Sequence, residues 1–236
     1  MKCVIFAGGK GSRIKLESDT TPKPLVTVGE MPIVWHIMKM YYHYGVKDFI
    51  LCLGYKQEDF KKYFLDLMNQ KKDISINFKN QELKVLNNNS EDWNITLVDT
   101  GLNTLTGGRL KRIEKYLDDD DDSFFLTYAD AVSDIDIKDL YEFHKKQKTL
   151  ATITVVKREE RFGVVELEDT NVKYFREKFL KEDEWINGGF MVVNKEVLKY
   201  LTPDSASFEK EILEKLVEKK QLSAYKHLGF WQCMDF

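Results

Sequence analysis

The chain has 236 residues, of which 43% are hydrophobic and 32% charged, and its 36 basic and 39 acidic side chains leave a formal net charge of −3. This balance excludes a general attraction to nucleic acid or to an anionic membrane, so any phosphate site must be local. Three scattered cysteines, Cys3, Cys52 and Cys233, have no metal-ligand spacing, which argues against zinc and favours a reducing cytoplasm. No apolar run reaches the roughly 18 residues that span a bilayer, and no signal peptide is expected.

The first seventy residues predict the order strand, loop, helix, strand, helix. Residues 2–7 are a continuous apolar run, as in a strand buried on both faces. Apolar residues at helical spacing predict a helix within 31–45, with Pro32 in its first turn and Gly45 at its end. A second buried strand and a second amphipathic helix follow at 48–54 and 58–68. This alternation predicts an α/β fold with a mostly parallel central sheet flanked by helices.

The rest of the chain predicts a more mixed arrangement. A helix is expected at 136–147, with Ser133 and Asp134 as its candidate caps. Three short, closely spaced strands favour an antiparallel portion at about 151–190. The other expected elements are strands at 93–101, 123–130, 185–194 and 222–227 and helices at 107–117 and 207–220.

The segment FAGGKGSR, from Phe6 to Arg13, directly follows the first predicted strand. It does not fit the dinucleotide fingerprint GxGxxG, whose third glycine position falls on Ile14, and it does not fit the Walker pattern. Three glycines here still favour a loop whose backbone N–H groups approach a triphosphate. Arg13 offers a planar pair of donors, and Lys23, between two prolines, offers a compact charge on a stiff backbone. On composition alone, a simple turn remains the alternative.

Longer motifs add a family resemblance that covers nearly the whole chain, from Met1 to Asp235. The segments FAGGKGSRI and TPKPLVTVGEMPIVWHIM, with TGGRLKR, RFG, INGGF and GFWQCMD, resemble the sugar-1-phosphate nucleotidyltransferases. VDTG followed by TGGRLKR is typical of their cytidylyl branch. The resemblance implies a Rossmann-like nucleotidyltransferase fold in a single domain, 1–236. Within it, about 1–150 would bind nucleotide and about 151–236 the sugar phosphate, with a smaller antiparallel sugar-binding portion.

The family reaction implied is transfer of the cytidylyl group of CTP to α-D-glucose 1-phosphate, giving CDP-glucose and pyrophosphate. Such chemistry requires alignment of the reacting groups and neutralisation of the phosphate charge, and it does not require a protein nucleophile. Arg13 would hold the leaving pyrophosphate and Lys23 the oxygens near the α-phosphorus. Asp130 and Asp235 would bind Mg²⁺, so Arg13, Lys23 and Asp130 are the implied catalytic residues.

The resemblance also implies two sets of binding residues. The nucleotide-binding set is Ala7, Gly8, Gly9, Gly11, Ser12, Arg13, Lys23, Thr106, Gly107, Gly108 and Arg109. The sugar-phosphate set is Tyr128, Glu177, Lys178, Asn187 and Gly188, with Gly188 and Gly189 leaving room for the sugar ring.

Ala131 and Phe179 depart from the family pattern and add bulk beside the sugar-phosphate site. Three alternatives therefore stay open: another sugar 1-phosphate, another NTP such as UTP or dTTP, or a catalytically silent nucleotide-binding homologue. The resemblance further implies a cytoplasmic homo-oligomer, with a hexamer among the candidate states, that serves polysaccharide biosynthesis. No nucleic-acid or membrane partner is expected.

Overall fold

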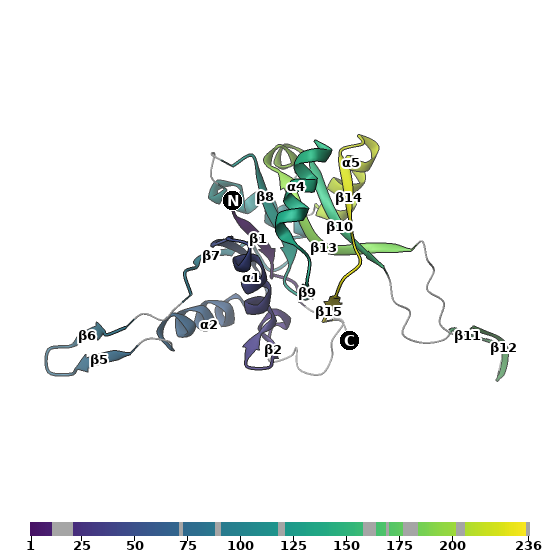
Figure 1. Cartoon of the computed structure of the whole chain (residues 1–236). Coiled ribbons are helices and arrows are strands. Elements are labelled where there is room, and N and C mark those ends of the chain that lie inside the picture. Colours follow the sequence, from purple (N-terminus) through teal and green to yellow (C-terminus); the bar gives the residue numbers. More distant parts are fainter. Residues whose placement is uncertain are drawn as a thin grey trace.

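A seven-stranded mixed sheet forms the centre of the computed structural model (Figure 1). The structure describes residues 1–10, 21–70, 73–87, 91–117, 121–157, 164–168, 170–176, 184–201 and 206–234. In spatial order, the sheet contains β14 (Leu222–His227), β10 (Ala151–Lys157), β13 (Trp185–Asn194), β8 (Ser123–Tyr128), β1 (Cys3–Phe6), β4 (Asp48–Leu53) and β7 (Asn94–Asp99). β13 runs antiparallel to its neighbours β8 and β10, and the other pairs are parallel. The predicted α/β class is confirmed.

The sheet separates two apolar cores because successive residues of a strand point to opposite faces. Cys3 and Ile5 of β1 belong to one core and Val4 and Phe6 to the other. The helices are α1 (Ile33–His43), α2 (Gln57–Gln70), α3 (Thr106–Ile113), α4 (Ile137–Gln147) and α5 (Glu214–Glu218), with 3-10 turns η1 (Lys23–Leu25), η2 (Glu114–Tyr116) and η3 (Lys195–Tyr200) and a π-helical turn η4 (Phe208–Leu213). No helix in the described ranges is long and apolar enough to cross a membrane.

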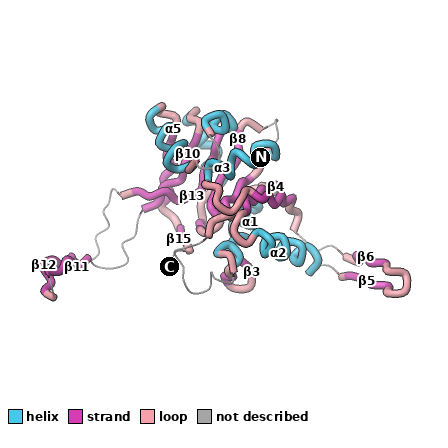
Figure 2. The backbone as a smooth tube through the Cα atoms, turned by 180° about the vertical axis from the view of Figure 1, so that it is seen from behind, coloured by secondary structure: helices cyan, strands magenta, loops and turns pink. Residues whose placement is uncertain are grey.

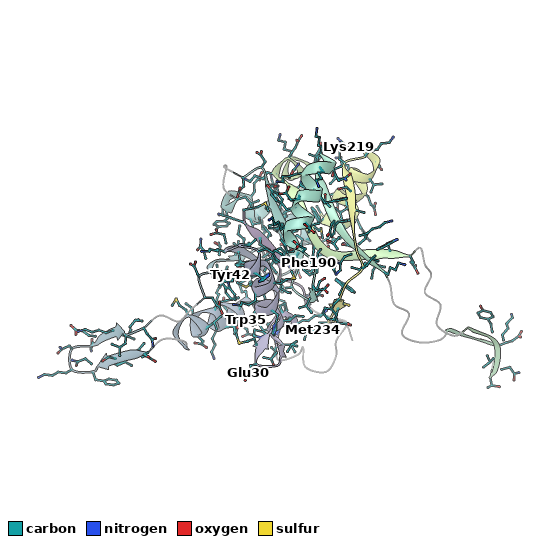
Figure 3. All side chains as sticks on the ribbon, in the orientation of Figure 1. Glu30, Trp35, Tyr42, Phe190, Lys219 and Met234 are labelled. Atoms are coloured by element: carbon teal, nitrogen blue, oxygen red, sulfur yellow. The ribbon has the colours of Figure 1, made fainter. Side chains whose placement is uncertain are left out.

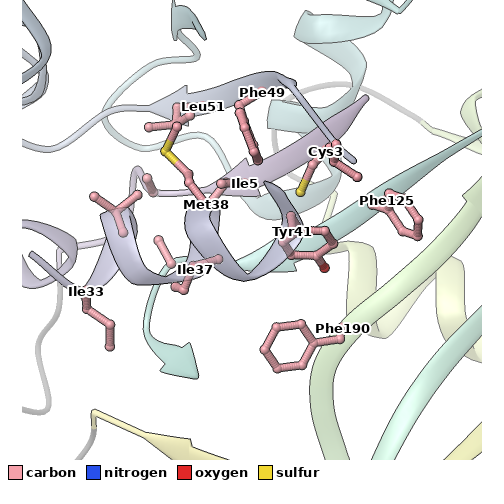
Figure 4. Close-up of a cluster of buried hydrophobic side chains, with 14 of the residues drawn as sticks. Cys3, Ile5, Ile33, Ile37, Met38, Tyr41, Phe49, Leu51, Phe125 and Phe190 are labelled. Carbon is pink, nitrogen blue, oxygen red and sulfur yellow. The ribbon is translucent and has the colours of Figure 1, made fainter. Parts of the chain in front are cut away.

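The first core lies between α1 and the strands that α1 covers (Figure 4). Ile37, Met38 and Tyr41 of α1 are fully buried, and they face side chains of β1 and β4 such as Ile5 and Leu51. Helix α1 follows Pro32, and the chain turns at Gly45 with φ of 85°. Gly45 follows the end of this helix as predicted, whereas Pro32 is its N-cap and not a residue of its first turn.

The cap of α4 differs from the expectation. Asp136 is its N-cap, and the carboxylate Oδ1 accepts from the backbone N–H of Asp139 at 2.9 Å. Ser133 instead ends the strand β9 (Ala131–Ser133), and Asp134 pairs with His227 at 2.9 Å. The chain stays extended beyond the predicted cap because β9 pairs with β15 (Trp231–Cys233).

The expected antiparallel portion is smaller than predicted. β10 and β13 both join the central sheet, and β10 pairs in parallel with β14, far along the chain. The separate antiparallel pair is β11 (Val164–Glu168) with β12 (Asn171–Arg176). Two further pairs were not predicted: β2 (Thr27–Val28) with β3 (Met31–Pro32), and β5 (Ile74–Asn77) with β6 (Glu82–Val85).

The β5–β6 and β11–β12 hairpins stand away from the body of the molecule in opposite directions (Figure 2). Figure 3 shows the side chains of β5 and β6 in open space, whereas Phe190 lies inside the body. On β5–β6 the cross-strand pairs Ile74 with Val85 and Ile76 with Leu83 share one face, and all four side chains are exposed. An isolated two-stranded hairpin is marginally stable in water, so this apolar face lacks the packing that normally supports such a hairpin.

Candidate active site

A cavity of about 410 Å³ opens beyond the carboxyl ends of β1 and β8. This is the place where α/β sheets of this kind bind ligands. Four distant parts of the chain and the π-helical turn line it: Phe6, Ala7, Gly8, Gly9, Lys23, Pro24, Thr104, Leu105, Thr106, Arg109, Tyr128, Ala129, Asp130, Ser207 and Glu209. The cavity therefore brings together the glycine loop, Lys23 with Pro24, Thr106 and Arg109 of the TGGR segment, and Asp130.

The glycine loop leaves β1 with Ala7, whose backbone N–H donates to the carbonyl of Cys52 at 3.1 Å. A side chain at Gly8 would clash with Nη1 of Arg109 and lie 2.5 Å from its Cζ. Gly9 has open space around it. Gly8 is thus small because the protein's own guanidinium lies against it, and in the described part of this loop Gly9 is the glycine with room for a ligand. Gly11, Ser12 and Arg13 lie outside the described residues.

Arg109 fastens the loop to the sheet from below. Its Nη1 donates to the Leu53 carbonyl at 2.9 Å and to Thr100 Oγ1 at 2.7 Å, and its Nη2 donates to the Gly8 carbonyl at 3.0 Å. The side chain is 5% exposed, and this burial lowers its pKa. Arg109 therefore ties together the ends of β1, β4 and β7, and it places a positive charge directly behind the loop. Its donors are committed to this role, although it also lines the cavity.

Lys23 and Asp130 form an ion pair in the cavity wall. Lys23 Nζ lies 2.8 Å from Asp130 Oδ2, and the two side chains are 9% and 36% exposed. Pro22 precedes the η1 turn as its N-cap, and Pro24 lies within it, so the backbone that carries Lys23 is restrained. A buried lysine stem with its ammonium group at the cavity is suited to bind phosphate oxygens.

The TGG segment of α3 is placed differently from the expectation. The backbone N–H groups of Gly107 and Gly108 donate to the Ala206 carbonyl at 2.9 and 3.3 Å, and a Cβ at Gly107 would lie 2.8 Å from that oxygen. The segment that packs closely against these glycines is the chain before η4. Their N–H groups therefore bind that segment and are not directed at a nucleotide. Thr106 remains in the cavity wall.

Glu209, which the sequence reading did not single out, faces the same cavity from η4. Its Oε2 accepts from Thr106 Oγ1 at 2.6 Å and Ser207 Oγ at 2.7 Å, and its Oε1 accepts from Tyr128 Oη at 2.6 Å. Burial raises the pKa of Glu209, but the three hydroxyl donors outweigh burial and hold the pKa below its ordinary value. The cavity therefore contains an ionised carboxylate. A π-helical turn is often associated with a functional site.

The expected sugar side is only partly described, because Glu177 and Lys178 lie outside the described residues. Tyr128 lines the cavity, and burial, followed by the neighbouring Glu209 carboxylate, raises its pKa. Asn187 is exposed, and its Oδ1 accepts from the backbone N–H of Gly189 at 2.9 Å.

The expected room for a sugar ring beside Gly188 and Gly189 is filled by side chains. A Cβ at Gly189 would lie 2.8 Å from the Tyr128 ring, and one at Gly188 would lie 3.1 Å from Val156. Gly188 also accepts a hydrogen bond at its carbonyl from Trp231 Nε1 at 2.8 Å. These glycines let β13 pass closely beside Tyr128 and Trp231.

Asp130 provides a carboxylate beside Lys23 that suits Mg²⁺ at a phosphate site, since Mg²⁺ usually takes one or two carboxylates together with substrate phosphates. Within the described ranges, no group of three or more histidine, cysteine, aspartate or glutamate side chains gathers as a metal site. Met234 donates its backbone N–H to the Asp130 carbonyl at 2.8 Å. The next residue, Asp235, lies outside the described residues.

The chain belongs to the nucleotidyl transferase family, whose model matches residues 2–233. It is 43% identical over 235 residues to the glucose-1-phosphate cytidylyltransferase of Salmonella typhi, covering 100% of this chain and 91% of the relative. It is 32% identical over 237 residues to the mannose-1-phosphate guanyltransferase of Hypocrea jecorina, covering 98% of this chain and 60% of the relative.

A solved structure supports the fold assignment. HddC from Yersinia pseudotuberculosis, complexed with GMP-PN, superposes with a TM-score of 0.69 at 22% identity, covering 100% of this chain and 94% of HddC. At this identity the likeness establishes the fold alone.

Proposed function

We propose that the chain transfers the cytidylyl group of CTP to α-D-glucose 1-phosphate, giving CDP-glucose and pyrophosphate. This is the activity of a glucose-1-phosphate cytidylyltransferase. The observation that carries the proposal is the 43% identity to such an enzyme over essentially the whole chain. The Lys23–Asp130 pair in a cavity beside the glycine loop agrees with it.

In this reaction, an oxygen of the sugar phosphate attacks the α-phosphorus of CTP in line, and the bond to the pyrophosphate oxygen breaks. The negative charge that moves onto the leaving group has to be neutralised, and the reacting groups have to be aligned. Lys23 contributes a restrained positive charge to the cavity, and Arg109 adds a buried one behind Gly8. We assign Arg13 to the pyrophosphate and Asn187, Glu177 and Lys178 to the sugar phosphate as proposals that rest on the family resemblance.

Asp130, with Asp235, would hold Mg²⁺. When bound, the metal supplies charge neutralisation at the phosphates. The Lys23–Asp130 pair already orients the Asp130 carboxylate toward the cavity, so Lys23 positions this ligand as well as binding phosphate.

Pyrophosphate release from CTP, glucose 1-phosphate and Mg²⁺ tests the proposal. Lys23→Ala should lower kcat/KM by about a hundredfold or more, as expected for loss of a preorganised charge. Lys61→Ala, which alters an exposed lysine paired with Glu58 on α2, should leave it unchanged. If the wild-type protein released no more pyrophosphate than Lys23→Ala, the proposal would be wrong.

A panel of other sugar 1-phosphates, together with UTP and dTTP, belongs in the same assay because Ala131 and Phe179 depart from the family pattern. Glucose 1-phosphate with CTP should give the highest kcat/KM. CTP binding in calorimetry without turnover of any pair would instead indicate a catalytically silent homologue.

We also propose that the chain is a homo-oligomer in which a second copy covers the apolar face of the β5–β6 hairpin. Exposed apolar patches of this kind mark interaction surfaces, and the family resemblance names a second copy as the occupant. Ile76→Lys and Leu83→Lys should shift the mass measured by light scattering downward. Ser75→Lys, on the polar face of the hairpin, is the matched control.

The reaction is assigned to the cytoplasm as part of this proposal. Cys3 and Cys52 are buried free thiols, as is usual in a reducing compartment.

A further inference from the structure

Glu209 is the feature of the cavity that the assigned reaction leaves without a role. Its carboxylate is held in one orientation by hydroxyls from α3, β8 and the start of η4. Within the described part of the chain, no lysine, arginine or histidine forms an ion pair with it. A partly buried carboxylate without a cation is costly unless it is well hydrogen-bonded. Three hydroxyl side chains thus maintain a fixed negative charge inside a nucleotide cavity.

A nucleotide bound in the cavity would be oriented by this charge. Lys23 and the open backbone at Gly9 attract the triphosphate, whereas the Glu209 carboxylate repels it. A nucleotide that places its phosphates against Lys23 therefore directs its uncharged part toward Glu209. Thr104, Leu105 and Thr106 line the same wall and provide a partly apolar surface for that part.

The carboxylate also has capacity for one more donor. Oε2 accepts from two side chains, whereas Oε1 accepts from one, Tyr128. Each carboxylate oxygen offers about two acceptor directions. An amino group on the nucleotide can therefore add a hydrogen bond to Oε1 without displacing any of the three hydroxyls.

Cytosine and uracil differ at the group that such a site would read. Cytosine carries a 4-amino group that donates hydrogen bonds, whereas uracil and thymine carry a carbonyl oxygen that accepts them. An ionised carboxylate only accepts hydrogen bonds, so it attracts the 4-amino group of cytosine and repels the carbonyl oxygen of uracil. We propose that Glu209 selects CTP over UTP by accepting a hydrogen bond from the 4-amino group of the cytosine base. This inference rests on the proposed function, since it names the residue that gives that function its choice of nucleotide.

The test compares CTP with UTP in wild-type protein, Glu209→Gln and the matched control Glu214→Gln, which alters an exposed glutamate on the adjoining α5. A glutamine can turn an N–H toward the uracil carbonyl. Glu209→Gln should therefore lower the ratio of kcat/KM for CTP over UTP by about tenfold to a hundredfold. Glu214→Gln should leave the ratio unchanged. A CTP/UTP ratio that stays within about twofold of the wild-type value in Glu209→Gln would overturn the proposal. If kcat/KM fell equally with both nucleotides, the unchanged ratio would indicate a contact to the ribose instead.

A second measurement needs no variant and no turnover, so it also covers the case in which Glu209→Gln folds poorly. Calorimetry on the wild-type protein compares CTP with the triphosphate of the pyrimidin-2-one ribonucleoside, which has the same ring without the 4-amino group. The Kd should rise by at least about tenfold. Equal Kd values would sink this inference alone, whereas absence of pyrophosphate release would sink the proposed function.

Discussion

A double-mutant cycle of Gly8→Ala and Arg109→Ala measures how far the glycine loop depends on the guanidinium beneath it. A Cβ at Gly8 would lie 2.5 Å from Cζ of Arg109, whereas non-bonded heavy atoms need about 3.5 Å. The guanidinium would have to withdraw by about 1 Å, which breaks its bonds of 2.7–3.0 Å to Thr100, Leu53 and Gly8. Each hydrogen bond from a charged donor contributes about 1.5 kcal/mol or more. With three such bonds broken, Gly8→Ala should lower the free energy of unfolding by about 4–5 kcal/mol.

In an Arg109→Ala background the space beside Gly8 is vacated, and the same change should cost less than about 1 kcal/mol. The coupling free energy, measured by urea unfolding followed by tryptophan fluorescence, should then be about 3–4 kcal/mol. Gly9→Ala, at a glycine with nothing nearby, should stay within about 0.5 kcal/mol of wild type. If Gly8→Ala were equally costly in both backgrounds, the guanidinium would not be the reason for the glycine.

Three further predictions concern stability. Burial lowers the pKa of His144 below 6.5, so below pH 6.5 the unfolded chain binds more protons than the folded protein, and stability falls with pH by up to about 1.4 kcal/mol per pH unit. In His144→Gln this loss should be smaller when urea unfolding is compared at pH 7.5 and 5.5. Gly107→Ala places a Cβ 2.8 Å from the Ala206 carbonyl and should cost about 2 kcal/mol in the same assay; an unchanged midpoint would contradict the packing of α3 against the chain before η4. Asp136→Ala removes the cap of α4 and should cost about 1 kcal/mol, whereas Asp136→Asn, which keeps an acceptor oxygen, should restore most of it.

The fold was predictable where the signal is local. Strands buried on both faces are continuous apolar runs, and the bounds of α1 follow from Pro32 and Gly45. Pairings between distant segments have no such signal: β10 lies beside β14 through contacts that no periodicity encodes. The strands β2, β3, β9 and β15 have two or three residues each, which is too short for an alternating pattern to be recognised.

The site was predictable where a charged residue is held by unusual neighbours, as Lys23 is by two prolines. A glycine, in contrast, indicates that something approaches the backbone closely, and the sequence does not say what. At Gly8 it is a guanidinium, at Gly107 a carbonyl and at Gly189 a tyrosine ring. Glu209 was missed because its helix carries glutamate or lysine at many positions, and composition does not distinguish the one carboxylate that faces the cavity.

The fastening of the loop by Arg109 limits how the glycine motif can be transplanted. The guanidinium that packs against Gly8 belongs to Arg109, which lies 101 residues further along the chain. A designer who grafted the loop alone onto another parallel sheet would leave the Gly8 carbonyl without this donor, and an empty space would replace the positive charge. The glycine loop thus depends on a second, distant segment, and a working graft would also have to include α3 and the strand ends to which Arg109 of α3 donates hydrogen bonds.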